Sequence, residues 1–290
     1  MITSFRQLES KIKQQTKKTI VLVNATDAVM IDAAKMAVEK GLANFILVGN
    51  KDIIENLLEQ SNSREMFEIF PSDNPAFDAV SLVRQDDNRI LMKGNIPTGT
   101  LLKAVLNRDT GLRQGALLSH VAVIESPQYP RLLFVSDGGI NISFDKDSMV
   151  GIVQNASDYV SRFGITNPAI GMMALVEEVN PKIPETVLAA EVAHALQDSY
   201  LIEGPIALDV ALSSDAAVHK GITSKIAGKT DILIMPNTTA ANHLVKGLGA
   251  IGSCLVGGVI VGATVPIILL SRSDDAETKL RSILLGLIKA

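Results

Sequence analysis

The first hundred residues alternate between short apolar runs and amphipathic segments, and this alternation restricts the fold more than any other feature. The apolar runs are typical of buried strands, and they lie at residues 19–26, 44–50, 67–70 and 88–95. The segments after them have helical spacing and end near residues 41, 60, 85 and 107. Strands that alternate with helices predict right-handed crossovers and a parallel sheet covered on both faces.

The pattern changes after residue 107. Two apolar runs there flank the turn-prone sequence SPQYP at residues 126–130, which predicts two strands joined by a hairpin or a longer loop. Helices and strands then alternate again up to an amphipathic helix at residues 275–290. We therefore expect a two-lobed α/β protein with parallel or mixed sheets and helices on both faces.

The change of pattern also places the expected lobes. We assign residues 1–112 and about 268–290 to the first lobe and residues 113–267 to the second. A C-terminal helix that returns to the first lobe would tie the two together. The active-site cleft is expected between them.

Residues 247–271 carry no charge, and residues 251–270 are long enough to span a bilayer. The pair Gly257-Gly258, Pro266 and the α/β pattern before them instead favour two consecutive buried elements of a parallel sheet. The N-terminus has Phe5, Leu8 and Ile12 at helical spacing and lacks the apolar core of a secretory signal. We therefore expect a cytoplasmic protein and not a membrane helix.

Charge, cysteine and histidine content and the missing motifs exclude several classes of function. The net charge is -4 and the longest basic run is Lys17-Lys18, so a nucleic-acid surface is not expected. The single cysteine, Cys254, lies in an apolar run, is typical of a buried thiol and cannot form an internal disulfide. The four histidines lack the spacing of metal ligands, and neither GxGxxG, a P-loop nor GxSxG is present. A metal site and covalent catalysis therefore lack support.

Polar clusters follow the apolar strands, where ligands bind in open parallel sheets. They lie at residues 24–26, 93–95, 137–141, 203–205, 237–239 and 271–275. Turns and helix caps favour the same residue types, so that alternative stays open for each cluster. In the last cluster Arg272 offers a planar fork for phosphate or carboxylate. The carboxylates after it also suit the first turn of the last helix.

Six segments occur in an order and spacing that resemble the phosphate acetyl/butyryltransferase family over essentially the whole length. They are MKGN at residues 92–95, SDGGIN at 136–141, FGITNPAIGMM at 163–173, IEGPIALDVAL at 202–212, MPNTTAANHLVK at 235–246 and LLSRSDDAETK at 269–279. GLRQGALLSHVAV at residues 111–123 and the ending SRSDDAETK look closer to the butyryl branch.

The resemblance implies a fold like that of isocitrate and isopropylmalate dehydrogenases, in a homodimer or larger assembly. It implies conversion of acyl-CoA and phosphate into acyl phosphate and coenzyme A through a ternary complex, without a tightly bound cofactor. By analogy Arg272 would hold the phosphoryl group, and Ser271 would hydrogen-bond to the thioester oxyanion. An acetyl substrate and a catalytically silent CoA-binding relative remain as alternatives.

The resemblance also implies a base that deprotonates the CoA thiol, but it does not assign this role to a single residue. The aspartate of the acetyl branch aligns with Thr278, which leaves Asp274, Asp275 and Glu277, and we prefer Asp275. A second phosphate-site arginine has no counterpart here, and Lys246 is the candidate for its charge. Besides Lys246, the expected substrate-binding residues are Asn242, Asn141, Asp137, Lys93, Asn95 and Arg113.

Overall fold

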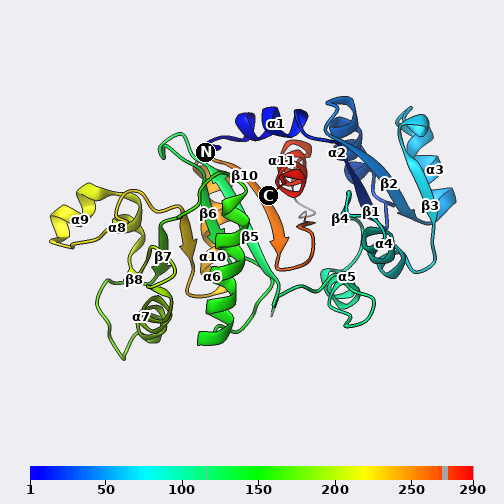
Figure 1. Ribbon diagram of the computed structural model, residues 1–290. Helices are drawn as coiled ribbons and strands as arrows, with labels where there is room; N and C mark the ends of the chain where they lie inside the picture. Colours follow the sequence, from blue (N-terminus) through cyan, green and yellow to red (C-terminus); the bar gives the residue numbers. More distant parts are fainter. Residues whose placement is uncertain (116, 270–273, 290) are drawn as a thin grey trace. The chain divides into compact units, whose positions relative to one another are not determined.

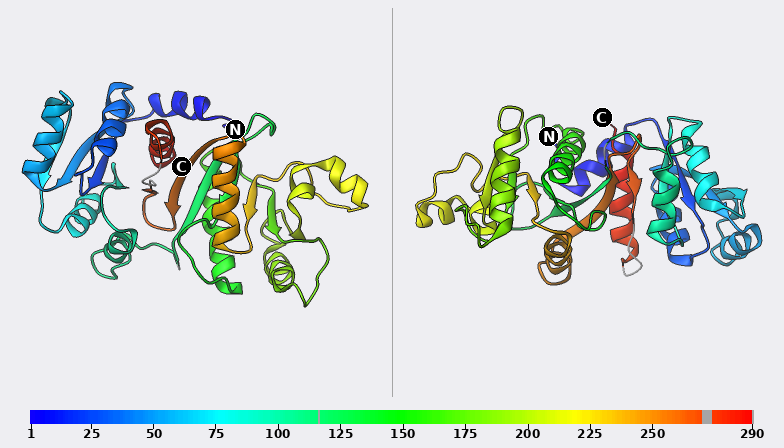
Figure 2. Two further views of the ribbon diagram at one scale, coloured as in Figure 1. Left: turned by 180° about the vertical axis from the view of Figure 1, so that it is seen from behind. Right: turned by 90° about the horizontal axis from the view of Figure 1, so that it is seen from below.

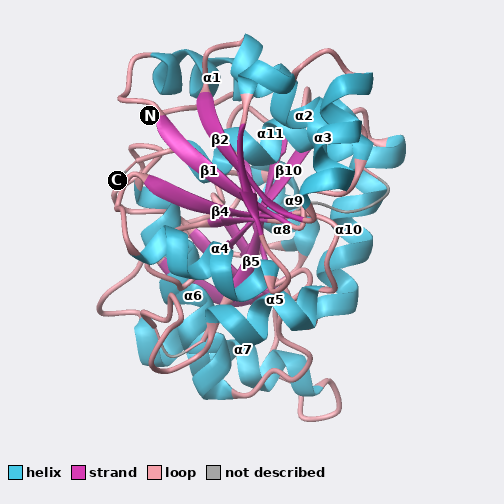
Figure 3. Ribbon diagram, turned by 90° about the vertical axis from the view of Figure 1, so that its right-hand side faces the viewer, coloured by secondary structure: helices cyan, strands magenta, loops and turns pink. Residues whose placement is uncertain are grey.

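The computed structural model describes residues 1–115, 117–269 and 274–289. Its contacts divide the chain into two units. The N-terminal unit comprises Phe5–Gly115 and Gly257–Lys289, and the central unit comprises Met1–Ser4 and Ala116–Val256. Both units combine strands with helices (Figure 1), and in both the helices flank the strands (Figure 3). The α/β class expected from the sequence is confirmed.

The strands of the N-terminal unit follow the order β3-β2-β1-β4-β11-β10. All neighbours from β3 to β11 are parallel, and β10 and β11 are antiparallel. Their bounds are β1 Lys18–Val23, β2 Ala43–Gly49, β3 Glu68–Pro71, β4 Arg89–Lys93, β10 Leu255–Val261 and β11 Ile267–Ile268. The four strands predicted in the first hundred residues are thus present.

Local sequence signals explain where the helices of this unit begin. The side chain of Asp27 accepts a hydrogen bond from the backbone of Met30, and Asn50 does the same for Ile53. Gly41 follows the second helix with a φ of 72°, which an L side chain rarely adopts. The helices are α1 Phe5–Lys13, α2 Ala28–Glu39, α3 Lys51–Gln60, α4 Pro75–Arg84, α5 Thr98–Val105 and α11 Ala276–Leu287, with a 3₁₀ turn at Arg64–Met66.

The uncharged run forms the end of one helix and then β10 and β11, and in the described part of the chain no helix is long and apolar enough to cross a membrane. We expected consecutive elements of a parallel sheet, but these two strands are antiparallel. The reason is the connection of only residues 262–266, because joining parallel strands needs a crossover of a dozen or more residues. Val259 and Ile260 are fully buried, which explains the absence of charge.

The strands of the central unit follow the order β5-β6-β9-β7-β8. β5 and β6 form an antiparallel pair around SPQYP, as predicted, and the other neighbours are parallel. The strands are β5 Ser119–Glu125, β6 Leu133–Ser136, β7 Ile170–Met173, β8 Ile202–Ile206 and β9 Ile232–Ile234.

The helices of the central unit lie on both faces of its strands, with α6 and α10 on opposite faces (Figure 2). Residues 208–220 form two short helices, because Ser213 interrupts the helical segment and caps the second helix through Ala216. The helices are α6 Lys146–Ser161, α7 Pro184–Leu196, α8 Leu208–Leu212, α9 Ser214–Lys220 and α10 Thr238–Ile251.

Close approach of the chain after β4 to the end of β1 requires glycine at position 94. A Cβ atom at Gly94 would lie 2.2 Å from the carbonyl oxygen of Val23 and 2.9 Å from that of Asn24. We expect Gly94→Ala to lower the free energy of unfolding by about 1–3 kcal/mol, because backbone must move to admit the methyl group. Urea unfolding measures this loss. Gly99→Ala is the control, since a Cβ there meets nothing within 4 Å, and an equal loss in both variants would contradict the expectation.

Candidate active site

The carboxyl ends of β1 and β4 bring the first predicted residues together in the N-terminal unit. Asn95 donates from its backbone to the carbonyl of Asn24 at 3.1 Å and from its side chain to Thr26 Oγ1 at 3.3 Å. The Asn24 side chain donates in turn to the carbonyl of Asn95. Lys93 is only 7% exposed, and its Nζ lies 3.3 Å from the carbonyl oxygen of Gly94. Two polar clusters that are far apart in sequence thus form one hydrogen-bonded group.

Asp137 organises the loop after β6 in the central unit. Its carboxylate is fully buried and accepts backbone hydrogen bonds from Gly139 at 2.9 Å, Ile140 at 3.1 Å and Asn141 at 3.0 Å. The Asn141 side chain also donates to Asp137, and to the carbonyl of Leu118 at 2.9 Å. A buried carboxylate with these donors stabilises the loop, and any effect on a ligand would pass through the loop.

The start of α10 packs on this loop. Asn237 caps the helix by accepting from the backbone of Ala240 at 2.8 Å, and Thr238 donates to the carbonyl of Asn141. Asn242 donates to the carbonyl of Gly138 at 3.3 Å. Lys246 is exposed one helical turn further on, on the same side of α10 as Asn242. The structure therefore brings Asp137, Asn141 and Asn242 to one loop, and Lys246 lies one helical turn from Asn242.

The predicted substrate-binding residues are thus divided between the units. Lys93, Asn95 and Arg113 belong to the N-terminal unit, and the other four belong to the central unit. Arg113 is exposed, and its Nε lies 3.5 Å from the carbonyl oxygen of Gly115. The cleft expected between the two lobes stays a prediction.

Asp275 caps the last helix, whereas the predicted residues Ser271 and Arg272 lie outside the described residues. The Asp275 carboxylate accepts a 2.7 Å hydrogen bond from the backbone of Thr278. Hydrogen bonds from the side chain and then the backbone of Thr278 hold the pKa of this carboxyl below its ordinary value. The cap that the sequence offered as an alternative is therefore present, and the carboxylate remains exposed.

The structure also reveals a buried lysine that the sequence pattern did not single out. Lys279 is 1% exposed, and its ammonium donates to the carbonyl of Asp274. A lysine in an amphipathic helix normally faces solvent, so the residue type at position 279 predicts an exposed side chain. The available signal was its position, since Lys279 lies four residues before the buried Ile283 and so shares its face.

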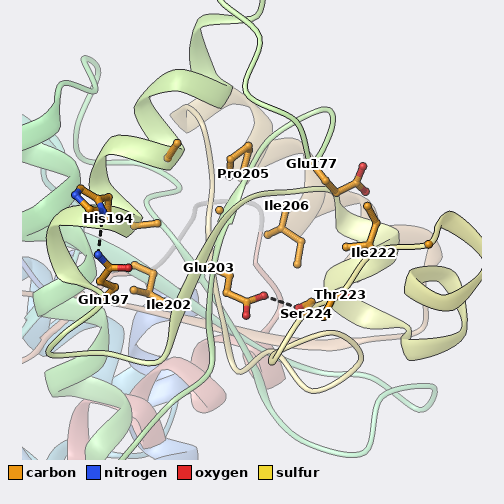
Figure 4. A pocket seen from close by; sticks show the side chains of 14 residues that line it. Glu177, His194, Gln197, Ile202, Glu203, Pro205, Ile206, Ile222, Thr223 and Ser224 are labelled. Carbon is orange, nitrogen blue, oxygen red and sulfur yellow. Dashed lines mark hydrogen bonds between the residues drawn. The ribbon is translucent and has the colours of Figure 1, made fainter.

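A cavity of about 500 Å³ lies at the edge of the central unit, beside β8 (Figure 4). Glu203 accepts hydrogen bonds there from Ser224 Oγ at 2.5 Å and from the backbone of Lys225 at 2.8 Å. Glu177 pairs with Lys220 at 2.9 Å. The cavity is lined by Glu177, Ala190, Ala193, His194, Gln197, Ile202, Glu203, Gly204, Pro205, Ile206, Gly221, Ile222, Thr223 and Ser224. One polar cluster, residues 203–205, borders it, but no predicted substrate-binding residue does.

Comparison with known proteins decides the family. The model of the phosphate acetyl/butaryl transferase family matches residues 4–78 and 65–287. The chain belongs to this family. The resemblance noted from the six sequence segments is thereby confirmed.

Individual members of the family match along nearly their whole length. The phosphate butyryltransferase of Clostridium acetobutylicum is 37% identical, with 100% of this chain and 99% of the relative covered. The phosphate acetyltransferase of Thermotoga maritima is 34% identical, with 94% of this chain and 95% of the relative covered. Among solved structures, a branched-chain phosphotransacylase from Enterococcus faecalis V583 has a TM-score of 0.83 and 31% sequence identity. The match covers 93% of this chain and 97% of that structure's chain. The fold is therefore that of a phosphotransacylase.

Proposed function

We propose that this protein transfers a short acyl group, butyryl or similar in length, between coenzyme A and inorganic phosphate. Phosphate oxygen attacks the thioester carbonyl, the new C–O bond forms, the C–S bond breaks, and coenzyme A leaves as a thiolate that takes up a proton. The observation that carries the proposal is the family match from residue 4 to residue 287. Sequence identity to relatives named as phosphate butyryltransferases supports an acyl group of about the length of butyryl.

The reverse reaction needs a base, which we assign to Asp275. A free thiol has a pKa of about 8.5, so most of it is protonated at neutral pH. A carboxylate that takes this proton contributes roughly 10²–10⁴-fold. The Asp275 carboxyl is ionised at neutral pH, and the hydrogen bonds from Thr278, which lower its pKa, make it a weaker base. In this proposal Arg272 binds the phosphoryl group and Ser271 donates to the oxyanion.

The remaining predicted residues have binding roles. Phosphate and the phosphates of coenzyme A need positive charge, which we assign to Lys246, Lys93 and Arg113. The amides of Asn95, Asn141 and Asn242 would supply hydrogen bonds. Asp137 would act through the loop that it holds.

The acidic cavity beside β8 is not assigned to acyl-CoA in this proposal. It presents Glu177 and Glu203, whose charge opposes an anionic ligand. One nearby cation, Lys220, already pairs with Glu177 and Asp209, each at 2.9 Å.

Some properties of the proposed enzyme rest on the family resemblance alone. We propose that it works without a tightly bound cofactor. We further propose that it forms a homodimer or larger assembly in the cytoplasm.

Variants that keep the capping role of Asp275 but remove its charge test whether Asp275 is the base. Asparagine is as good an N-cap as aspartate, so Asp275→Asn should leave stability within about 0.5 kcal/mol, whereas Asp275→Ala should cost about 1 kcal/mol. If Asp275 is the base, both variants lose roughly 10²-fold or more in the rate of thiol attack on acyl phosphate. Rates and melting temperatures measure both. Wild-type rates in Asp275→Asn would move the role to Asp274 or Glu277.

The same variant changes how stability depends on pH. The pKa of Asp275 is lower in the folded protein than its ordinary value of 3.8, so its charge stabilises the fold above that value. This contribution is lost as pH falls through the folded pKa. Any stability advantage of wild type over Asp275→Asn should therefore shrink below about pH 3.8, as acid-dependent melting would record.

The proposed reaction is tested by release of free thiol from acetyl-CoA, propionyl-CoA and butyryl-CoA, each with and without phosphate. We expect phosphate-dependent release that is fastest with butyryl-CoA. Fastest release from acetyl-CoA would show that the preferred acyl group is acetyl and not butyryl. No release from any of the three would refute the reaction and leave a CoA-binding relative.

A further inference from the structure

The buried ammonium of Lys279 is in an energetically unfavourable place. The side chain is 1% exposed and lies in the first turn of α11, which begins at Ala276. The first turn of a helix carries the positive end of its dipole, which disfavours a cation. Burial of a charge adds a desolvation penalty, which an uncharged side chain of similar volume would avoid. A residue with two such penalties calls for a compensating role.

The contact that Lys279 makes lies outside the helix. Among the residues that the structure describes, its ammonium has the carbonyl of Asp274 as hydrogen-bond partner. Asp274 precedes the cap residue Asp275, so this contact extends order beyond the cap by one residue. The cap itself orders only residues on its C-terminal side, through the backbone of Thr278.

The helix that carries Lys279 is firmly attached to the N-terminal unit (red in Figure 1). Ser282 accepts a 3.0 Å hydrogen bond from the backbone of Gly258 at β10. A Cβ atom at Gly286 would lie 2.4 Å from Ile268 Cγ1, which shows how closely α11 approaches β11. Lys279 therefore connects a fixed helix to the backbone that leads into it.

We propose that Lys279 is a positioning residue that holds the backbone at Asp274, and so orients the acidic segment that carries the proposed base. The inference rests on the proposed function, because it assigns Asp275 to catalysis. Lys279 acts through the Asp274 carbonyl. The prediction that separates this role from a structural one is loss of turnover without loss of stability.

Lys279→Met tests the proposal because it keeps side-chain length and removes the charge. We expect kcat to fall at least tenfold, KM for acyl-CoA to change less than threefold, and the melting temperature to stay equal or rise. Lys279→Arg keeps a donor and should recover part of kcat. Lys103→Met, at an exposed position on α5, is the control and should leave every value unchanged.

An activity-independent measurement completes the test. Amide hydrogen exchange in the peptide over residues 274–279 should be at least tenfold faster in Lys279→Met than in wild type. Wild-type kcat or wild-type exchange in Lys279→Met would overturn the proposal, as would a large drop in melting temperature, which would make the role structural. If wild type shows no phosphate-dependent thiol release, the proposed function fails, and exchange alone decides whether Lys279 orders this segment.

Discussion

Replacement of Arg272 by alanine is expected to lower kcat/KM for phosphate by about 10²–10³-fold while the protein stays folded. A guanidinium can hold a phosphoryl group through two parallel charge-assisted hydrogen bonds, and loss of such stabilisation costs about 2.7–4 kcal/mol in the transition state. The expectation rests on the proposed role of the Ser-Arg pair. Initial rates of thiol release over a range of phosphate concentrations measure it.

Two further variants sharpen this experiment. Arg272→Lys keeps the charge but loses the planar fork, so its activity should fall between wild type and alanine. Arg64→Ala is the matched control, because Arg64 lies in the 3₁₀ turn and forms a 3.5 Å contact with the partly exposed Glu55. It should keep wild-type rates. Wild-type kinetics in Arg272→Ala would place the phosphate site elsewhere.

Replacement of Asp137 by alanine is expected to lower the free energy of unfolding by about 3–5 kcal/mol. The change removes the fully buried carboxylate that accepts from the backbone amides of Gly139, Ile140 and Asn141, and each of these hydrogen bonds is worth about 1 kcal/mol or more. Asp137→Asn keeps one acceptor oxygen and should lose less. Urea unfolding of the full chain measures each loss.

A second aspartate supplies the control for Asp137. Asp145 also accepts a backbone hydrogen bond, from Ser148 at 2.8 Å, but it does so at the exposed start of α6. Its loss leaves an amide that water can reach, so Asp145→Ala should destabilise the protein much less than Asp137→Ala. Equal unfolding midpoints for the two alanine variants would contradict the role of Asp137 in holding the loop.

The contrast between these aspartates shows how far the sequence could define the site. Asp137 and Asp145 are the same residue type, and both precede a turn or helix. The motif SDGGIN marked the first as a candidate ligand residue, which stays a prediction, and the structure adds that its carboxylate is a fully buried acceptor of internal hydrogen bonds. Burial depends on what the rest of the chain places over a residue, and the local pattern does not contain that information.

The order of strands and helices, the hairpin around SPQYP and the cap at Asp275 were all predictable from the sequence. Each depends on the residue and its neighbours within a turn or two, through periodicity, turn preference and capping. The family was also predictable, because its segments retain their order.

Tertiary structure alone decided which residues meet and which are buried. It joined Asn95 to Asn24 and Thr26, and it placed Lys279 inside the fold. These outcomes arise from pairings between residues that are distant in sequence. Their energies come from strand order, close packing and desolvation, which a local pattern of residue types does not specify.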